Sequence, residues 1–288
     1  MLGKVVLVGG THGNETSGIQ LINHWKQHGV PEHLASLNLG LVIANHSAIK
    51  DNVRFVDEDL NRQFTYQALA EQKDTLEAKC AEQFNQEFGP KGSSTTELVV
   101  DIHNTTSNMG ATLIILETDH FNTQLARYVK HVMPEAIILV EDEKPFEEHG
   151  YLCTVGKKGV MIEVGAQPQG VMREDVYKLV EKMAIAILTF CAHYNENESL
   201  VETPCEAFRL GETVSFPLDD KGERTAMVHR DLQDNDFAPL LPGDPVFRAF
   251  NGETIGWWGN EVTFPHFINE AAYSKLHIAF ATADKCEI

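Results

Sequence analysis

The sequence predicts an α/β protein with a mixed, mostly parallel sheet flanked by helices and a smaller C-terminal β domain. Over the first two thirds of the 288 residues, short apolar runs alternate with segments of helical periodicity, as in parallel strands connected by helices. Beyond a polar, acidic stretch at 195–204, the chain changes to short apolar or alternating segments separated by Gly, Pro and Asp. That change is typical of β structure joined by turns.

The elements of the first part follow from these patterns. Strands are expected at residues 4–8, 39–44, 96–102, 111–116, 136–140 and 159–164. Helices are expected at residues 16–28, 69–88, 121–133 and 174–194. The last helix carries apolar residues at helical spacing, interrupted by Lys178, Glu181 and Lys182, which indicates packing against a sheet and not a membrane span.

The second part is expected to form its own small β domain. Its strand candidates are residues 206–216, 225–229, 245–250, 254–259 and 261–267. The polar stretch at 195–204 is typical of a linker. We therefore predict two domains, covering residues 1–197 and 198–288.

Composition and charge exclude several classes of partner. The formal net charge is −19, whereas nucleic acid and anionic membrane surfaces require a basic footprint. No apolar stretch approaches the ~20 residues that span a bilayer, and the short apolar start is unlike a signal peptide. The five cysteines are scattered and odd in number, which favours a reducing compartment. The sequence predicts a cytoplasmic protein without nucleic-acid or membrane partners.

His12 and Glu15 form the first chemical motif. They lie three residues apart in GGTHGNE, directly after an apolar run. Such a pair alone is weak evidence, because helix surfaces carry it for capping or solubility. The surrounding glycines indicate a tight loop that directs both side chains over the end of a strand. Catalytic zinc takes three protein ligands and leaves one position open, so this segment is interpreted as the first half of a zinc site.

His103 is the candidate for the third ligand. It follows the apolar run 98–100 at the end of the expected strand, a position that also suits a hydrogen-bonded core histidine. Asp101 lies two residues earlier and therefore on the same strand face. Its carboxylate would orient a ligand imidazole, and the competing interpretation is that it caps a loop.

Two arginines, Arg54 and Arg62, lie in an acidic segment that contains DLNR. Without a metal, the simplest interpretation is a solvated, salt-bridged loop. Beside a metal, Arg54 would stabilise the oxyanion of a tetrahedral intermediate. Arg62, together with Asn61, would bind a substrate carboxylate, since the guanidinium fork matches a carboxylate in two hydrogen bonds.

Glu163 lies within the apolar run 159–164. A buried glutamate is costly unless it is paired or its pKa is raised. It is therefore a candidate general base, which would take a proton from water and return it to a leaving amine. A solvent-facing glutamate at a strand end is the alternative, because a turn follows at 165–168.

Five ordered segments resemble aspartoacylase and its relatives within the zinc carboxypeptidase-like superfamily. They span residues 9–273 and read GGTHGNE, DLNR, DIHNTTSN, EVGAQPQG and FINEAAY. The resemblance implies a carboxypeptidase-like catalytic domain at 1–197 and a β domain at 198–288 that covers the active-site mouth.

The same resemblance assigns roles to single residues. It implies one zinc ion (Zn²⁺) per chain, held by His12, Glu15 and His103. It implies acid/base catalysis by Glu163, oxyanion and substrate contact by Arg54, and carboxylate binding by Asn61 and Arg62. It adds substrate contact by Tyr273, which the sequence alone would describe as a packing residue with a solvated hydroxyl. A homodimer is also compatible with the resemblance.

One position departs from the pattern. Aspartoacylases are expected to carry an arginine ten residues before the catalytic glutamate, for the substrate's second carboxylate, and here that residue is Cys153. Lys157 or Lys158 would have to supply the missing charge, without the fork of an arginine. The aminoacylase-3 branch, which acts on N-acetylated aromatic amino acids, also lacks that arginine.

These observations predict a zinc amidohydrolase that acts on a small anionic N-acyl amino acid, with N-acetylaspartate as the first candidate. The enzymatic alternatives are an aminoacylase-3-like deacetylase, a succinylglutamate desuccinylase and a metallocarboxypeptidase. From another class, a zinc-containing binding protein would use the same pocket without turnover, but binding alone does not require a buried general base.

Overall fold

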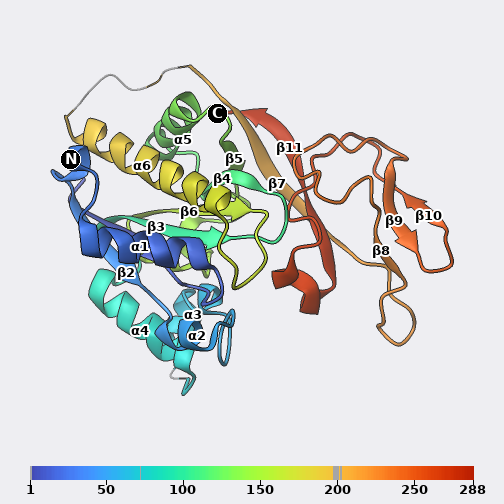
Figure 1. The fold of residues 1–288 in the computed structure, drawn as a ribbon, viewed down its shortest axis with the longest axis horizontal. Helices are drawn as coiled ribbons and strands as arrows, with labels where there is room; N and C mark the ends of the chain where they lie inside the picture. Colours follow the sequence, from blue (N-terminus) through green and yellow to red (C-terminus); the bar gives the residue numbers. More distant parts are fainter. Residues whose placement is uncertain (1, 72, 197–200, 202) are drawn as a thin grey trace.

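A computed structural model describes residues 2–71, 73–196, 201 and 203–288. Its centre is one eight-stranded sheet of order β11-β7-β5-β4-β6-β3-β1-β2 (Figure 1). The strands are β1 (Lys4–Gly9), β2 (Asn38–Ile43), β3 (Thr96–Asn104), β4 (Gly110–Ile115), β5 (Ile137–Val140), β6 (Lys158–Gly165), β7 (Glu206–Ser215) and β11 (Ile278–Glu287). All six strands expected in the first part are present, with ends shifted by at most two residues.

The sheet is mixed and mostly parallel, as predicted. Five of its seven pairings are parallel, and the antiparallel pairs are β4 with β6 and β7 with β11. Its strands are nearly continuous apolar runs because helices and loops cover both faces.

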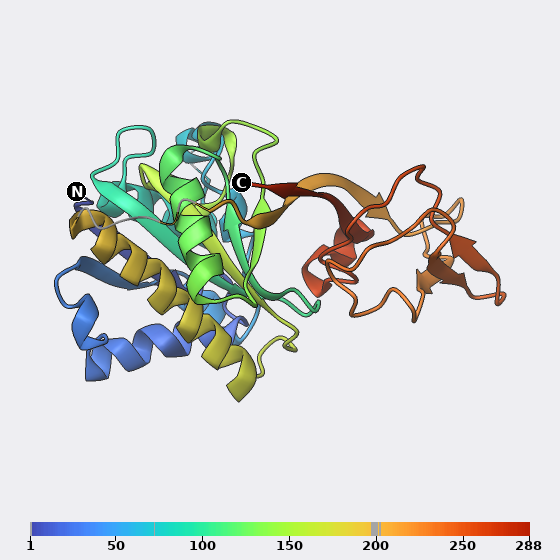
Figure 2. The same ribbon diagram turned by 90° about the horizontal axis from the view of Figure 1, so that it is seen from above.

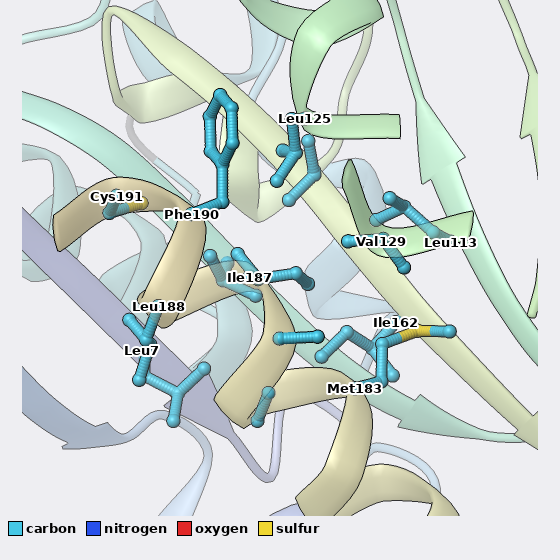
Figure 3. Close-up of a cluster of buried hydrophobic side chains, with 14 of the residues drawn as sticks. Leu7, Leu113, Leu125, Val129, Ile162, Met183, Ile187, Leu188, Phe190 and Cys191 are labelled. Atoms are coloured by element: carbon cyan, nitrogen blue, oxygen red, sulfur yellow. The ribbon is translucent and has the colours of Figure 1, made fainter. Parts of the chain in front are cut away.

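Three long helices cover one face of the sheet: α1 (Thr16–His28), α5 (His120–Val132) and α6 (Glu174–Glu196) (Figures 1 and 2). Helix α6 buries an apolar stripe that includes Met183, Ile187 and Phe190 (Figure 3). These side chains pack with Leu125 of α5 and Ile162 of β6 in one core cluster. The core on this face fixes the positions of β3 and β6.

The other face of the central strands packs against a second set of helices. They are α2 (His46–Asp51), α3 (Tyr66–Ala70), α4 (Leu76–Phe88) and the 3₁₀ helices η2 (Leu60–Arg62), η3 (Phe146–Glu148) and η4 (Leu152–Val155). The predicted single helix at 69–88 is wrong. Helix α3 ends before Glu71, whose backbone is extended, and helix α4 begins after its N-cap residue Thr75. The Thr75 hydroxyl accepts a hydrogen bond from the backbone N–H of Ala78, which caps α4.

The C-terminal part forms a second lobe (Figure 2) and also extends the central sheet through β7 and β11. The lobe contains a small antiparallel sheet of β8 (Ala226–Val228), β9 (Pro245–Ala249) and β10 (Thr254–Gly256). The strand expected at 261–267 forms only isolated bridges, at Thr263 and His266. Strand β11 was not expected, and it follows a 3₁₀ helix, η5 (Ala271–Leu276).

The expected linker at 195–204 is only partly described. Residues 195 and 196 end helix α6, and residues 197–200 and 202 lie outside the described residues. The division into domains at 197 and 198 therefore stays a prediction. None of the helices in the described part of the chain is long and apolar enough to cross a membrane.

Candidate metal centre and substrate pocket

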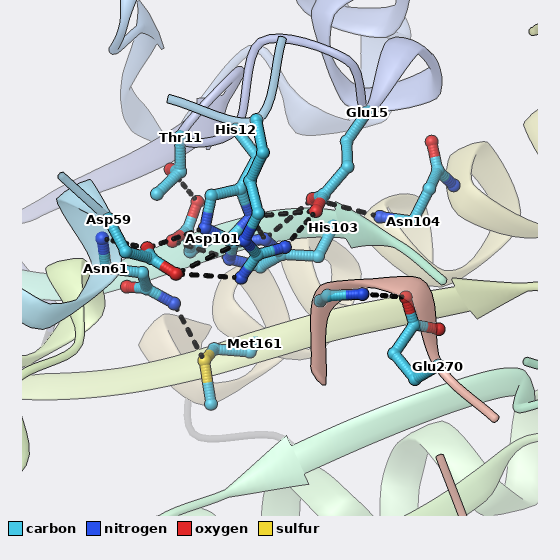
Figure 4. Close-up of polar contacts among 12 residues, drawn as sticks. Thr11, His12, Glu15, Asp59, Asn61, Asp101, His103, Asn104, Met161 and Glu270 are labelled. Atoms are coloured by element: carbon cyan, nitrogen blue, oxygen red, sulfur yellow. Dashed lines mark hydrogen bonds and ion pairs between the residues drawn. The ribbon is translucent and has the colours of Figure 1, made fainter. Parts of the chain in front are cut away.

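His12, Glu15 and His103 converge on one buried point at the ends of β1 and β3 (Figure 4). Possible ligand atoms of the three residues lie within 4.8 Å of one another. His12 Nδ1 lies 2.7 Å from Glu15 Oε1, and His103 Nδ1 lies 2.8 Å from Glu15 Oε2. The two Nδ1 atoms are 3.2 Å apart. The structure thus brings together the three residues that the sequence predicts as metal ligands.

A carboxylate contacts the outer nitrogen of each histidine. His103 Nε2 lies 2.8 Å from Asp101 Oδ2, and His12 Nε2 lies 2.9 Å from Asp59 Oδ1. The hydroxyl of Thr11 donates to the other oxygen of Asp101 at 2.7 Å. The expected contact between Asp101 and His103 is therefore present. The equivalent contact of Asp59 was missed, because 47 residues separate it from His12.

The chemistry of this donor set fits a metal ion. A carboxylate on each Nε2 favours a proton there, which leaves the Nδ1 lone pair free. Two such lone pairs and the Glu15 carboxylate then face one point, where acceptors would repel one another unless a cation or a proton lies between them. Burial favours the neutral acid of Glu15, but His12 and His103 outweigh it and lower the pKa of Glu15.

Glycines shape the loop that carries His12 and Glu15. Gly10 adopts a positive φ of 75°, which residues with a side chain rarely adopt. A Cβ on Gly13 would lie 2.1 Å from the carbonyl carbon of Ala48. The loop therefore packs directly on the start of α2, and this contact holds the two ligands against the sheet.

Glu163 lies next to the metal centre on the neighbouring strand. It is the parallel register partner of His103, so both side chains leave the same face of the sheet. In the described part of the chain, its carboxylate has no protein hydrogen-bond partner. Burial, with the charges of Glu15 and Glu270, raises the pKa of Glu163 to about 8, against the lowering effect of His103 and Arg54. It is a protonatable group in the pocket wall, not a solvent-facing strand end.

Arg54 contacts the metal centre directly. Its Nη1 donates to Glu15 Oε1 at 3.2 Å, and its Nε and Nη2 donate to Asp59 Oδ2 at 3.2 and 3.0 Å. The guanidinium also lines the pocket. The structure therefore places a fixed positive charge beside the candidate ligands.

Asn61 and Arg62 line the same pocket from η2. Asn61 Oδ1 accepts the N–H of Leu152 at 2.7 Å, and its Nδ2 contacts the Met161 sulfur at 4.0 Å, which leaves one N–H of the amide for a ligand. Arg62 donates to the carbonyl of Asn61 at 2.7 Å and stacks over the Tyr151 ring at 5.3 Å. Arg62 forms no ion pair with any described residue, which leaves its charge available to an anion.

Tyr273 reaches the pocket from the C-terminal part of the chain. It lies in η5, and its ring packs edge-on against Phe267 at 5.6 Å. Glu270 holds this segment to the loop after β3: its Oε2 accepts the N–H groups of Thr106 and Ser107 at 2.8 and 3.0 Å. The pocket is therefore completed by both parts of the chain, and sequence reasoning gave Glu270 no role.

Cys153 and the two lysines do not contribute to the pocket lining. Cys153 is fully buried in η4. Lys157 pairs with Glu97 and Lys158 with Asp119, both at 2.5 Å. The expectation that one of these lysines replaces the missing arginine is therefore wrong, because both extend toward other carboxylates.

Two further polar residues, Glu141 and Tyr151, line the pocket together with apolar Ile114 and Met161. Tyr151 donates its hydroxyl to Glu141 Oε2 at 3.1 Å. Both lie in 141–151, a segment without strand or helix periodicity, so no sequence pattern pointed to them. These residues surround about 450 Å³ of space, open solvent at the mouth included.

Comparisons with known proteins agree along the whole chain. Residues 2–191 match the succinylglutamate desuccinylase/aspartoacylase catalytic domain, and residues 203–285 match the AstE/AspA barrel-sandwich hybrid domain. The chain is 41% identical to aspartoacylase from Danio rerio over 97% of its length and 90% of that protein. It is 38% identical to the N-acyl-aromatic-L-amino acid amidohydrolase (carboxylate-forming) of Xenopus laevis, covering 98% and 94%.

A solved structure is equally similar in fold. Murine aminoacylase 3 superposes with a TM-score of 0.93 at 35% identity, covering 100% of this chain and 96% of that one.

Proposed function

The chain belongs to the succinylglutamate desuccinylase/aspartoacylase family, and from this premise we propose that it is a zinc-dependent amidohydrolase of N-acyl amino acids. One observation carries the proposal: the cluster of His12, Glu15 and His103 lies in one pocket with Glu163, next to His103 in register. A cytoplasmic location, a homodimer and a two-domain division at 197 and 198 are part of the proposal on sequence grounds alone.

One zinc ion per chain would be held by His12, Glu15 and His103, with Asp59 and Asp101 orienting the two imidazoles. When bound, zinc supplies Lewis-acid chemistry, which polarises a carbonyl and favours ionisation of water at neutral pH.

Glu163 would act as the general acid and base. A pKa near 8 lies close to neutral pH, where a group exchanges protons most effectively. Glu163 would remove a proton from the attacking water and return it to the nitrogen of the leaving amino acid. Its lack of a protein hydrogen-bond partner in the described residues leaves the carboxyl available for both transfers.

Each of the two arginines would bind a different negative charge of the reaction. Arg54, beside Glu15, would stabilise the oxyanion as it develops. Arg62, with the amide nitrogen of Asn61, would hold the α-carboxylate of the substrate in two hydrogen bonds. Tyr273 would contact the substrate from the C-terminal side of the pocket.

The acyl group proposed is a short one such as acetyl, and N-acetylaspartate is the first candidate substrate. Relatives with the names aspartoacylase and N-acyl-aromatic-L-amino acid amidohydrolase are equally similar to the chain. N-acetylated aromatic amino acids are the second candidate. The observation that favours them is the apolar wall of Ile114, Met161 and Phe267.

The test of this proposal is the Glu163→Ala variant, with exposed Glu174→Ala as the matched control. We expect Glu163→Ala to lower kcat at least 10²-fold, roughly the contribution of general acid and base catalysis, while bound zinc is unchanged. The control should keep full turnover. Near-normal hydrolysis by Glu163→Ala would contradict the assignment, and a wild-type protein that binds zinc and acyl amino acids without turnover would be a binding protein.

A further inference from the structure

Glu141 is a buried carboxyl in the substrate pocket that the proposed reaction does not use. It directly follows β5, and its side chain is about 5% exposed. In the pairing of β4 with β5, Ile114 is opposite Leu139. Glu141 lies two residues beyond Leu139 and therefore leaves the same face of the sheet. Met161 is opposite Ile114 on the other side, so these residues form one continuous pocket floor.

Glu141 and Glu163 lie toward opposite ends of that floor. Along β4, Thr112 is the register partner of Glu163, and the residue after Ile115 lies opposite Glu141. Four residues of strand separate the two levels, roughly 13 Å along the strand direction. An N-acyl amino acid with its amide at Glu163 would therefore direct its far end toward Glu141.

Arg62 connects this far end to the proposed substrate contacts. Its guanidinium stacks over the Tyr151 ring, and the Tyr151 hydroxyl donates to Glu141. The charge of Glu141 and burial raise the pKa of Tyr151, so its hydroxyl remains a donor at neutral pH. A substrate whose α-carboxylate binds Arg62 would have its side chain beside the Glu141 carboxyl.

No described cation lies within 4 Å of Glu141. The titratable and charged groups that act on it are Arg62, Glu143, Lys144, Tyr151, Cys153 and Tyr273. Burial, then the charge of Glu143, raises the pKa of Glu141 to about 7 against the opposing effect of Tyr151 and Arg62. The carboxyl therefore changes charge within the physiological range.

We propose that Glu141 sets the charge of the substrate side chain that this pocket accepts, admitting a second carboxylate when protonated and excluding it when ionised. This inference rests on the proposed hydrolysis of N-acyl amino acids. A protonated carboxyl donates a hydrogen bond to a carboxylate, whereas two carboxylates in a low-dielectric site repel each other. An uncharged side chain is accepted in both states.

The experiment compares N-acetylaspartate with N-acetylasparagine, which are nearly identical in shape and differ in one charge. Zinc-loaded protein is assayed from pH 6 to 8, and the measured quantity is the ratio of the two kcat/KM values, aspartate over asparagine. Titration of Glu163 affects both substrates and cancels in this ratio. Glu141→Gln removes the ionisable group, and exposed Glu148→Gln removes a charge from the same segment as the matched control.

For the wild type and Glu148→Gln, we expect the ratio to fall roughly tenfold from pH 6 to 8, because the protonated fraction of a group with a pKa of about 7 falls by that factor. In Glu141→Gln the ratio should be flat and, at pH 8, roughly tenfold above the wild type. Glu141→Ala serves as a second variant should the glutamine variant fail to fold.

The possible outcomes distinguish failure of the Glu141 proposal from failure of the proposed hydrolysis. A wild-type ratio that is flat from pH 6 to 8 overturns the role of Glu141, whatever the variants do, and leaves hydrolysis intact. A fall in the ratio that persists in both Glu141 variants assigns the selection to another group and also overturns it. Absence of hydrolysis of both substrates by wild-type protein means that the proposed function itself fails.

Discussion

At the residue scale, the two proposed histidine ligands depend on carboxylates that lie on the side of each ring away from the candidate metal position. Asp59 and Asp101 each contact an Nε2 atom, which directs the Nδ1 lone pairs toward Glu15. The candidate metal centre therefore consists of five side chains, and three of them are the proposed ligands. This arrangement gives the site its geometry before a metal binds.

The variants Asp59→Asn and Asp101→Asn test this dependence. Each keeps an acceptor oxygen but removes the charge that fixes the tautomer and orientation of the imidazole, so zinc affinity should fall roughly 10- to 100-fold. A competition titration against a zinc indicator measures the change, with exposed Asp51→Asn as the control. Unchanged affinity in both variants would mean that the carboxylates only fill space.

The Arg62→Lys variant tests the proposed carboxylate contact. A lysine keeps the charge but loses the two-pronged geometry, so KM should rise roughly tenfold while kcat changes less. Steady-state kinetics separate the two constants, and exposed Arg230→Lys is the control. A lower kcat at unchanged KM would instead mean that Arg62 contacts the reacting group mainly in the transition state.

At the scale of elements, Glu270 connects the loop after β3 to the segment before β11. Its Oε2 also accepts the hydroxyl of Ser107 at 3.1 Å, and its Oε1 accepts the N–H of Ala272. Four donors from two parts of the chain therefore depend on one carboxylate. The position of Tyr273 follows from this connection.

The Glu270→Ala variant should be destabilised and less active. Loss of an acceptor shared by buried N–H groups costs about 2 kcal/mol or more in the free energy of unfolding. Urea denaturation measures the stability, with exposed Glu261→Ala as the control. Equal stability of the two variants would show that water replaces the carboxylate without cost.

The sequence predicted the elements whose bounds depend on residues within the same segment. Helix α1 has the expected bounds, because the apolar spacing and Gly29 determine them within the segment. The split between α3 and α4 was missed, since the Thr75 cap lies inside an otherwise helical pattern. Strand β11 was missed because its assignment depends on pairing with β7, more than 60 residues away.

The site shows the same division. The sequence predicted the residues of the site that lie in short motifs: His12, Glu15, His103 and Glu163. Glu141 was not, because its place in the pocket follows from the register of β4 with β5 and from Tyr151. A sequence motif cannot report a contact that the sheet topology creates.

At the scale of the whole molecule, the net charge is −19, and the pocket carries four glutamates beside its two arginines. The two arginines and a bound zinc ion would supply the positive charge that attracts the proposed anionic substrate. We also expect a bound metal to stabilise the fold, because its proposed ligands come from distant parts of the chain.

Zinc should stabilise the folded protein. Free zinc at 100 times its Kd would add about 2.7 kcal/mol to the free energy of unfolding, because the ligands converge only in the fold. Thermal melts with zinc and with a chelator measure this, and His103→Ala should lose the difference while exposed His131→Ala keeps it. A zinc effect of equal size in His103→Ala would place the ion elsewhere.

The most direct measurement is release of free amino acid from N-acetylaspartate and N-acetyltyrosine, side by side, by zinc-loaded protein and by chelator-treated protein. We predict hydrolysis of at least one substrate, its loss on chelation and its recovery when zinc is restored. Inactivity on both substrates with zinc bound at His12, Glu15 and His103 would contradict an amidohydrolase of N-acyl amino acids.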